Sequence, residues 1–277
     1  MPETSSVATH YTHGDLLAAI TAGLAKLGKT LDTVLLEDLA PIDEFHIGGR
    51  AATESFLDPL GIEAGDQVLD VGCGLGGASR FAAHRYGCRV TGIDLTDEFV
   101  QTGKVLSSWV GLADRVVLEQ GDASATGYAE GMFDKAFMLH VGMNIADKSA
   151  LALELHRILK PGGTLGIYDI MYLGDGELAY PVPWATSADR SDIGSPADYR
   201  EALKAAGFRI TVERNRREFA LDFFAGLQAS ASLAGGPPPL GLHILFGETA
   251  PTQIQNMVRN ITENRITPIE LIAKKLL

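Results

Sequence analysis

The sequence predicts an α/β fold: a doubly wound, mostly parallel sheet covered by helices. Short apolar segments alternate with longer segments whose apolar residues recur at helical spacing, and this alternation fills the middle of the chain. The short segments are almost wholly apolar, which is typical of parallel strands buried on both faces. The first of them runs into a glycine-rich turn that opens a helix. Strands separated by helices in this way indicate repeated right-handed crossovers.

Seven strands are expected along the chain, with helices between most of them. The strands are expected at Gln67–Val71, Arg89–Asp94, Val116–Glu119, Phe133–Val141, Thr164–Asp169, Phe208–Glu213 and Thr267–Ala273. The helices between them are expected at Ala78–Tyr86, Glu98–Val110, Lys148–Leu159 and Pro196–Ala206. Lys160-Pro161-Gly162-Gly163 has the composition of a turn and is expected to lead into the fifth strand.

Three regions stand outside this alternation. The N-terminal 60 residues contain one amphipathic helix that ends near Gly28 and a second at Thr53–Leu60. A segment at about 172–195 contains Tyr180-Pro181-Val182-Pro183-Trp184, which suits neither a helix nor a central strand. Residues 219–264 are expected to form a helical insertion before the last strand, lying over the carboxyl edge of the sheet, where open α/β sheets bind ligands.

Composition excludes several classes of protein. The 277 residues carry 23 Lys and Arg against 35 Asp and Glu, a net charge of -12, so no basic nucleic-acid footprint is expected. No apolar run is long enough to span a bilayer, and the N-terminus lacks the pattern of a secretory signal, so the cytoplasm is the expected compartment. Two cysteines, Cys73 and Cys88, and no HExxH pattern argue against a disulfide scaffold and against a metal site.

The strongest local feature is the glycine loop that follows the first strand. Gly72, Gly74 and Gly77 satisfy the GxGxxG pattern of dinucleotide-binding proteins, and Asp94 stands at the end of the next strand, where those proteins keep a ribose-binding acid. However, Asp70 precedes the loop and no basic residue lies within it, which suits a pyrophosphate poorly. A ligand that combines adenosine with positive charge fits the loop better.

With these residues the chain resembles class I S-adenosylmethionine-dependent methyltransferases, whose fold is Rossmann-like. Asp70-Val71-Gly72-Cys73-Gly74 resembles the family's D-x-G-x-G motif, and Leu159 to Gly163 resembles its turn before the fifth strand. The resemblance implies that S-adenosyl-L-methionine is the cofactor, that Asp94 binds its ribose, and that Leu95 covers its adenine. It also implies a contact of Gly121-Asp122-Ala123 with the adenine amino group.

The segment Phe45 to Thr53 is similar to small-molecule enzymes of this family, such as the sarcosine/dimethylglycine and phosphoethanolamine N-methyltransferases. This narrower resemblance implies an N-terminal helical lid over residues 1–60 and a methyltransferase domain over residues 61–277, with substrate-cap insertions at about 172–195 and 219–264.

Four residues are candidates for catalysis. His140, after the fourth strand, is the ionisable group expected nearest to the methyl donor, as a cofactor contact or a general base. Asn144 occupies the position where phosphoethanolamine methyltransferases carry a catalytic His, and an amide accepts no proton at neutral pH. Tyr11 matches the lid tyrosine of similar enzymes, although it could equally be an exposed tail residue. His46 is expected near the methionine end of the cofactor or, alternatively, as a surface or capping residue.

The expected acceptor is a small molecule, with an amine nitrogen favoured. Met143, Trp184 and Phe223 are expected to wall its pocket, although aromatic residues at such spacing also occur in plain cores. One alternative is O- or C-methylation of an apolar natural product or lipid-like metabolite, and another is a catalytically silent cofactor-binding module. Cys73 could be a reactive thiol or simply a small residue packed at the turn. The oligomeric state stays open.

Overall fold

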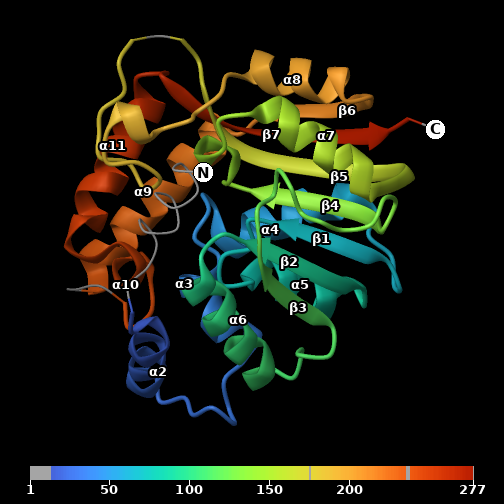
Figure 1. The fold of residues 1–277 in the computed structure, drawn as a ribbon. Coiled ribbons are helices and arrows are strands. Elements are labelled where there is room, and N and C mark those ends of the chain that lie inside the picture. Colours follow the sequence, from blue (N-terminus) through green and yellow to red (C-terminus); the bar gives the residue numbers. More distant parts are fainter. Residues whose placement is uncertain (1–13, 175, 235–237, 277) are drawn as a thin grey trace.

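The structure is a computed structural model that describes residues 14–174, 176–234 and 238–276 (Figure 1). A single sheet runs through the middle of the molecule, with strand order β3-β2-β1-β4-β5-β7-β6. Its strands are β1 (Gln67–Val71), β2 (Arg89–Asp94), β3 (Val116–Gln120), β4 (Phe133–Leu139), β5 (Leu159–Tyr172), β6 (Phe208–Asn215) and β7 (Ile266–Lys275). Only β7 is antiparallel to its neighbours, β5 and β6. The predicted seven-stranded, mostly parallel sheet is confirmed.

Helices cover both faces of this sheet because each strand sends alternate side chains to opposite sides. In β1, Leu69 and Val71 join the core beneath α7 (Lys148–Ile158) and α8 (Pro196–Ala205). Val68 faces the other way, into the core beneath α4 (Gly49–Leu57), α5 (Gly77–Tyr86) and α6 (Asp97–Trp109). The fold is therefore doubly wound, as the apolar strands predict.

The strand β5 begins earlier than the sequence indicates. Helix α7 ends at Ile158, and β5 starts at Leu159, so the expected turn at Lys160–Gly163 lies inside the strand. The pairing with β4 jumps from Phe133↔Leu159 to Lys135↔Thr164, so the segment is an irregularity in the ladder. Gly162 has a φ of 76°, which a residue without a side chain adopts at little cost.

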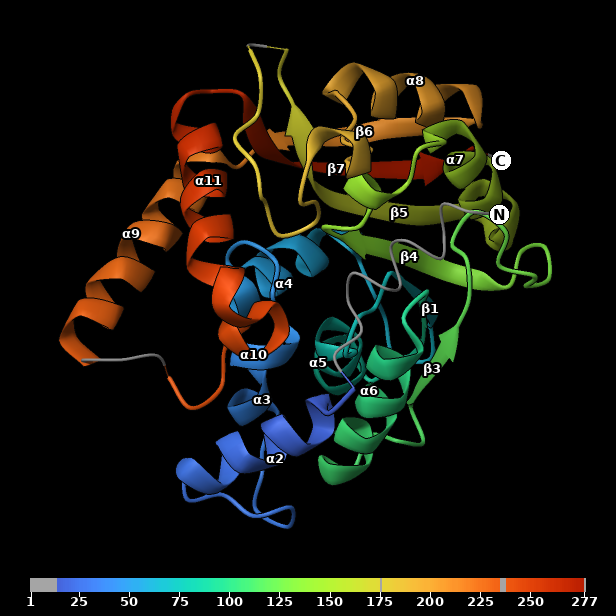
Figure 2. The same cartoon turned by 60° about the vertical axis from the view of Figure 1, so that its left-hand side comes forward.

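Of the N-terminal helices, α2 (Leu16–Lys26) and α3 (Leu36–Asp43) lie beside the sheet, whereas α4 packs on one of its faces (Figures 1 and 2). Helix α4 is followed by a short 3-10 turn, η1 (Asp58–Leu60). Helix α3 was not predicted from the sequence, and the predicted start of α4, Thr53, lies four residues after the observed start. Helix α3 packs against α5, which carries the glycine loop at its start. Through this contact, the N-terminal segment lies close to the glycine loop.

The insertion lies between β6 and β7, as expected. It contains α9 (Arg217–Ala234), α10 (Leu242–Phe246) and α11 (Ala250–Thr262), and α10 packs against α2 and α3 (Figure 2). Residues from this insertion and from the 172–195 segment form one apolar cluster, which we call the cap cluster. Its buried members are Ile47, Met143, Ile170, Val182, Trp184, Ala185, Ala220, Phe224, Met257, Ile261 and Ile266. In the described part of the chain, no helix has the length and apolar character needed to cross a membrane.

Candidate functional site

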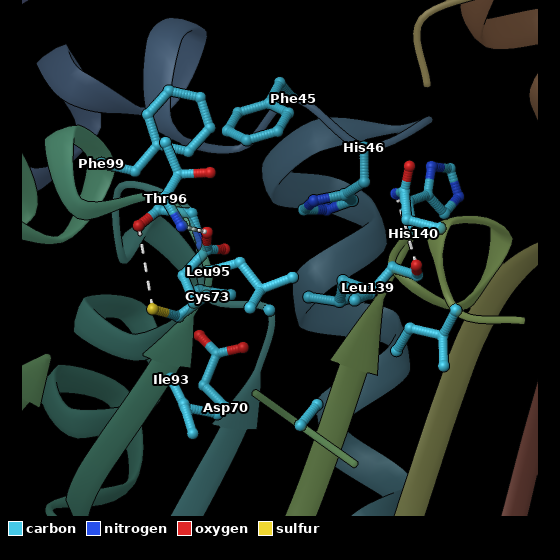
Figure 3. Close-up of a pocket in the computed structure, with 18 of the residues that line it drawn as sticks. Phe45, His46, Asp70, Cys73, Ile93, Leu95, Thr96, Phe99, Leu139 and His140 are labelled. Carbon is cyan, nitrogen blue, oxygen red and sulfur yellow. Dashed lines mark hydrogen bonds between the residues drawn. The ribbon is translucent and has the colours of Figure 1, made fainter. Parts of the chain in front are cut away.

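A cavity of about 120 Å³ lies at the carboxyl ends of the parallel strands (Figure 3). The turns that follow β1, β2, β3 and β4 all contribute to it, because parallel strands end at the same edge of a sheet. Each of the ten residues predicted to contact the cofactor lines this cavity: Asp70, Gly72, Cys73, Gly74, Asp94, Leu95, Gly121, Asp122, Ala123 and His140.

The glycine loop is held in place by the neighbouring strands. The backbone N–H groups of Gly72 and Cys73 both donate to the carbonyl of Ile93 in β2, at 2.8 and 3.0 Å. Gly72 has a φ of 69°, and a Cβ there would lie 2.4 Å from Cγ2 of Val141. Glycine is therefore required at this position both by the backbone conformation and by the side chain that follows β4.

Asp94, at the end of β2, connects the loop to the next helix. Its two carboxylate oxygens accept hydrogen bonds from the N–H groups of Gly74 and Thr96, each at 2.9 Å. Burial raises the pKa of Asp94, and these two hydrogen bonds oppose the rise. The side chain of Thr96 also hydrogen-bonds this carboxylate. A carboxylate has about four acceptor sites, so Asp94 keeps capacity for a ligand hydroxyl.

Asp70 is a second buried acid below the loop. Ser79 of α5 donates to Asp70 Oδ2 at 2.6 Å. Burial raises the pKa of Asp70 to about 7, and the bond from Ser79 partly opposes this. In the same loop, burial first and then the neighbouring carboxylate of Asp94 raise the pKa of Cys73. Cys73 is therefore a protonated, packed thiol at neutral pH, which contradicts the reactive-thiol alternative.

Several lining residues were not predicted. Phe45 and Phe99 form an aromatic wall with ring centroids 6.1 Å apart (Figure 3). Asp43, at the end of α3, lines the cavity and forms a buried ion pair with Arg80 of α5, with Oδ2 2.6 Å from Nη2. Asp43 Oδ1 is buried without a hydrogen-bond partner. The only signal in the sequence was an arginine among the small and apolar residues of α5.

The candidate histidines lie together at one end of the cavity, with ring centroids 6.0 Å apart. His140 has a φ of 56°, which is unusual for a residue with a side chain. Its Nδ1 accepts from the N–H of Ile47 at 3.4 Å, and its Nε2 is buried without a partner. Burial lowers the pKa of His140, and His46 nearby lowers it further, so the ring is neutral at pH 7. Asn144 also lines the cavity.

The other predicted site residues lie elsewhere. Tyr11 falls outside the described residues. Met143, Trp184 and Phe223 belong to the cap cluster or pack against it, and none of them lines the cavity. The indole N–H of Trp184 donates to Ser191 Oγ at 2.9 Å, so the ring is fixed within the cap segment. The cap cluster meets the cavity where Ile47 follows His46 and Met143 precedes Asn144.

The charges around the cavity have one sign. Four aspartates, Asp43, Asp70, Asp94 and Asp122, line it, and no Lys or Arg is among its described lining residues. Across the described ranges, no group of three or more His, Cys, Asp or Glu side chains is arranged to hold a metal ion. The site therefore offers carboxylates and neutral imidazoles to a ligand.

Comparison with known proteins identifies the domain that carries this site. A family model described as "Methyltransferase domain" matches residues 69–167, which contain the glycine loop, Asp94 and Asp122. The chain carries a methyltransferase domain. The predicted resemblance is confirmed. Asp43, Phe45 and His46 precede the matched part of the methyltransferase domain, although they line the same cavity.

Curated relatives support the same domain. A sterol 24-C-methyltransferase from Eremothecium gossypii is 33% identical over 164 residues, which cover 57% of this chain and 44% of that protein. Phosphoethanolamine N-methyltransferase 1 from Zea mays is 30% identical over 171 residues, covering 62% of this chain and 34% of that protein. The chain thus matches less than half the length of either relative.

A solved structure extends the likeness of the fold beyond the methyltransferase domain. Geranyl diphosphate C-methyltransferase from Streptomyces coelicolor A3(2), in complex with Mg²⁺, geranyl diphosphate and S-adenosyl-L-homocysteine, aligns with a TM-score of 0.72 at 19% identity. The alignment covers 100% of this chain and 98% of that chain. The N-terminal helices and the insertion therefore belong to a known form of the fold.

Proposed function

We propose that this protein transfers a methyl group from S-adenosyl-L-methionine to a small molecule, with an amine nitrogen as the favoured acceptor. The observation that carries the proposal is the cavity itself, which joins the glycine loop, Asp94, Asp122 and two neutral histidines in one space. The curated relatives are named as methyltransferases, and one structural neighbour was solved with S-adenosyl-L-homocysteine, the demethylated cofactor.

The lining residues fit this cofactor chemically. Asp94 keeps an acceptor site for a ribose hydroxyl, and Asp122, whose Oδ1 accepts from the N–H of Ser124 at 2.8 Å, would receive the adenine amino group. Leu95 would cover the adenine, and Gly72 and Gly74 would admit the methionine part. The unpartnered Oδ1 of Asp43 and Nε2 of His140 are an acceptor and a donor that a ligand with an ammonium and a carboxylate group can satisfy.

When bound, the cofactor supplies an electrophilic methyl group on a sulfonium, and the acceptor's lone pair must approach it in line. The residues of this chain then have two tasks: they orient the acceptor and they keep water out. Asn144 and the two histidines are the polar groups at the end of the cavity that meets the cap cluster, so they are placed to orient an acceptor.

The charge of the lining favours an amine over a phosphorylated acceptor. An ammonium is attracted by carboxylates, whereas a phosphate needs Lys, Arg or a metal, and the described lining provides none of these. The amide of Asn144, where phosphoethanolamine enzymes carry a His, points in the same direction. The apolar cap cluster favours a second candidate, O- or C-methylation of an apolar metabolite, because an apolar acceptor body could pack against it.

Calorimetry and turnover together test this proposal. The protein is titrated with S-adenosyl-L-methionine, its demethylated product and NAD⁺, and is then incubated with a methyl-labelled donor and panels of amines, phenols and apolar alcohols. The proposal expects binding of both sulfur compounds, weaker binding of NAD⁺, and label transfer to an amine. Binding without transfer to any panel would instead support a silent cofactor-binding module. Preference for NAD⁺ would refute the cofactor assignment.

A further inference from the structure

A chain of buried polar side chains leads away from the cavity behind His46. His46 Nε2 lies 3.1 Å from the carbonyl oxygen of Gly49 and 3.0 Å from Thr53 Oγ1. The hydroxyl of Thr53, a fully buried residue, donates to Glu44 Oε2 at 2.6 Å. Glu44 is itself buried and pairs through Oε1 with Arg50. These side chains precede residues 69–167, which the family model matches, and the function proposed above gives no role to Thr53 or Glu44.

The hydrogen-bond partners of His46 Nε2 determine which ring nitrogen of His46 carries the proton. A carbonyl oxygen only accepts, so Gly49 requires a proton on Nε2. The hydroxyl proton of Thr53 is directed at the Glu44 carboxylate, so Thr53 Oγ1 also presents a lone pair to Nε2. His46 is therefore the Nε2–H tautomer, and the lone pair is on Nδ1. No described residue bonds to Nδ1, and the ring lines the cavity (Figure 3).

His140 is held in the opposite sense. Its Nδ1 lone pair already accepts the N–H of Ile47, which leaves Nε2 as a donor. Of the two imidazoles at the cavity, only His46 offers a free lone pair among the described residues. From the sequence, His140 was expected to be the ionisable group nearest to the methyl donor, but its hydrogen bonds leave it without a free lone pair.

We propose that His46 Nδ1 is the general base of this site, and that Thr53 and Glu44 are positioning residues that hold its tautomer and receive its second proton. The inference rests on the proposed methyl transfer and deepens it. It specifies the class of acceptor: a nucleophile that must lose a proton to react, such as an ammonium or a hydroxyl group held against His46.

The proton balance closes within these side chains. The N–H or O–H bond of the acceptor breaks, its electron pair stays on the acceptor atom, and the proton goes to His46 Nδ1. The acceptor's electron pair forms the bond to the methyl carbon, while the former C–S pair stays on the sulfur of the donor. The Nε2 proton can pass to Thr53 Oγ1 as the hydroxyl proton of Thr53 passes to Glu44. This arrangement, a base oriented by a hydroxyl and a carboxylate, follows the logic of other oriented histidine bases.

The electrostatics are consistent with these roles. Burial lowers the pKa of His46 to about 4, so the ring is neutral at pH 7 and Nδ1 presents its lone pair. Because burial disfavours the imidazolium, His46 can act as a base only when its Nε2 proton moves on toward Glu44 as Nδ1 takes up the new one. Burial, together with the neighbouring Asp43, raises the pKa of Glu44 to about 7, while Arg50 and Thr53 oppose the rise. A carboxylate whose pKa lies near neutrality can take up a proton and release it again during turnover.

The tautomer can be tested without turnover. Two-bond ¹H–¹⁵N correlation spectra of the ¹⁵N-histidine-labelled protein with the demethylated cofactor present, assigned through His46→Gln, report which ring nitrogen carries the proton. We expect Nε2–H in the wild type and in Thr53→Ser, which keeps the hydroxyl. Thr53→Val should also keep Nε2–H, because the carbonyl of Gly49 still accepts it, but its Nε2–H resonances should shift because the hydroxyl partner is lost. A proton on Nδ1 in the wild type, or Nε2–H resonances that do not change in Thr53→Val, would overturn the assignment.

Single-turnover rates with the acceptor found in the labelled-methyl assay test the chemistry. Gln can place its amide N–H near the position of the Nε2–H group but has no basic nitrogen, so His46→Gln should keep cofactor affinity within about threefold. Its rate should fall by about 10²-fold or more. Thr53→Val should lose about tenfold, with recovery in Thr53→Ser. Glu44→Gln should alter the acidic limb of the pH–rate profile relative to the wild type. Asp43, Asp70 and Arg50 interact electrostatically with Glu44 and therefore also influence this limb.

The outcomes separate the two ideas. If the wild type transfers no label to any acceptor, the proposed function fails and this inference fails with it. If the wild type is active and His46→Gln is equally active, only the inference fails. If His46→Gln loses rate and cofactor affinity in parallel, His46 is a cofactor ligand and the base assignment is wrong. His84→Gln, at an exposed histidine on α5, is the matched control and should change none of these readouts.

Discussion

Replacing Arg80 by Met is expected to destabilise the protein strongly, because this side chain joins three helices inside the core. Arg80 is fully buried, and its guanidinium bonds Asp43 Oδ2 at 2.6 Å, the carbonyl of Gly103 at 3.1 Å and Ser107 Oγ at 3.0 Å. Helix α3 is thereby fastened to α5 and α6, and α3 carries the segment that leads to His46.

The size of the effect follows from what the substitution leaves behind. Ser107 Oγ already donates to the carbonyl of Gly103 at 2.9 Å, so these two groups keep a partner when Arg80 is lost. Asp43 does not, because its Oδ1 is already unpartnered and its Oδ2 loses the guanidinium of Arg80, its one cationic partner among the described residues. Leaving one member of a buried ion pair costs about 3–5 kcal/mol. Removing the second charge as well, in Arg80→Met with Asp43→Asn, should recover about 2 kcal/mol of that loss.

Urea unfolding of the wild type, both single variants and the double variant gives the coupling energy directly. Arg200→Met is the control, since Arg200 pairs with Glu213 at an exposed position and should cost less than about 1 kcal/mol. If Arg80→Met costs no more than this control, or if Asp43→Asn adds its full loss to that of Arg80→Met, the ion pair does not hold α3 in place and the reasoning is wrong.

Three further variants test the site. Asp94→Ala should weaken binding of the sulfonium cofactor by about 1–3 kcal/mol, or 5- to 150-fold by calorimetry, because two backbone N–H groups and the ribose lose their acceptor; unchanged affinity would refute the ribose assignment. Gly72→Ala should lower the melting temperature and abolish binding, since its Cβ would lie 2.4 Å from Val141, whereas Gly174→Ala, which has a φ of 90° and open space, carries the backbone strain alone. Glu44→Gln should flatten the pH dependence of stability. Because the pKa of Glu44 is raised in the folded state from 4.5 to about 7, its protonation favours folding below the unfolded pKa, and up to about 3 kcal/mol is lost as pH rises through the folded pKa. If the difference between the urea midpoints of the wild type and Glu44→Gln stays constant from pH 4 to pH 8, the raised pKa of Glu44 is contradicted.

The sequence predicted those parts of the molecule whose signals are local. One continuous stretch contains the apolar strands, the glycine loop and the acid that ends β2. Within it, the spacing of apolar residues or of glycines indicates each element. Together with the resemblance to methyltransferases, these signals named ten residues that line the cavity. The insertion between the last two strands was also predictable, from the long helical stretch that separates the two strand patterns.

The rest of the site depends on contacts between distant segments. Helix α3 was missed because Pro41 lies inside it, and proline ordinarily argues against a helix. The bond between Asp43 and Arg80 joins residues 37 apart in the sequence. The alignment of His46 with Thr53 and Glu44 requires the backbone turn at Gly48 and Gly49, where φ is 94° and 48°. No residue pattern reveals the direction of a hydroxyl proton.

The insertion leaves and rejoins the sheet at neighbouring points. Strands β6 and β7 are hydrogen-bonded to each other, the N–H of Arg216 donates to the carbonyl of Pro268 at 2.8 Å, and Thr267 Oγ1 donates to Asn215 Oδ1 at 2.8 Å. These hydrogen bonds hold the two ends of the segment next to each other. Each doubling of the length of such a closed segment costs only about 0.6 kcal/mol. The length of residues 216–265 can therefore change at little cost in chain entropy, as long as the contacts of α10 with α2 and α3 are kept, and the glycine loop lies outside the segment that changes.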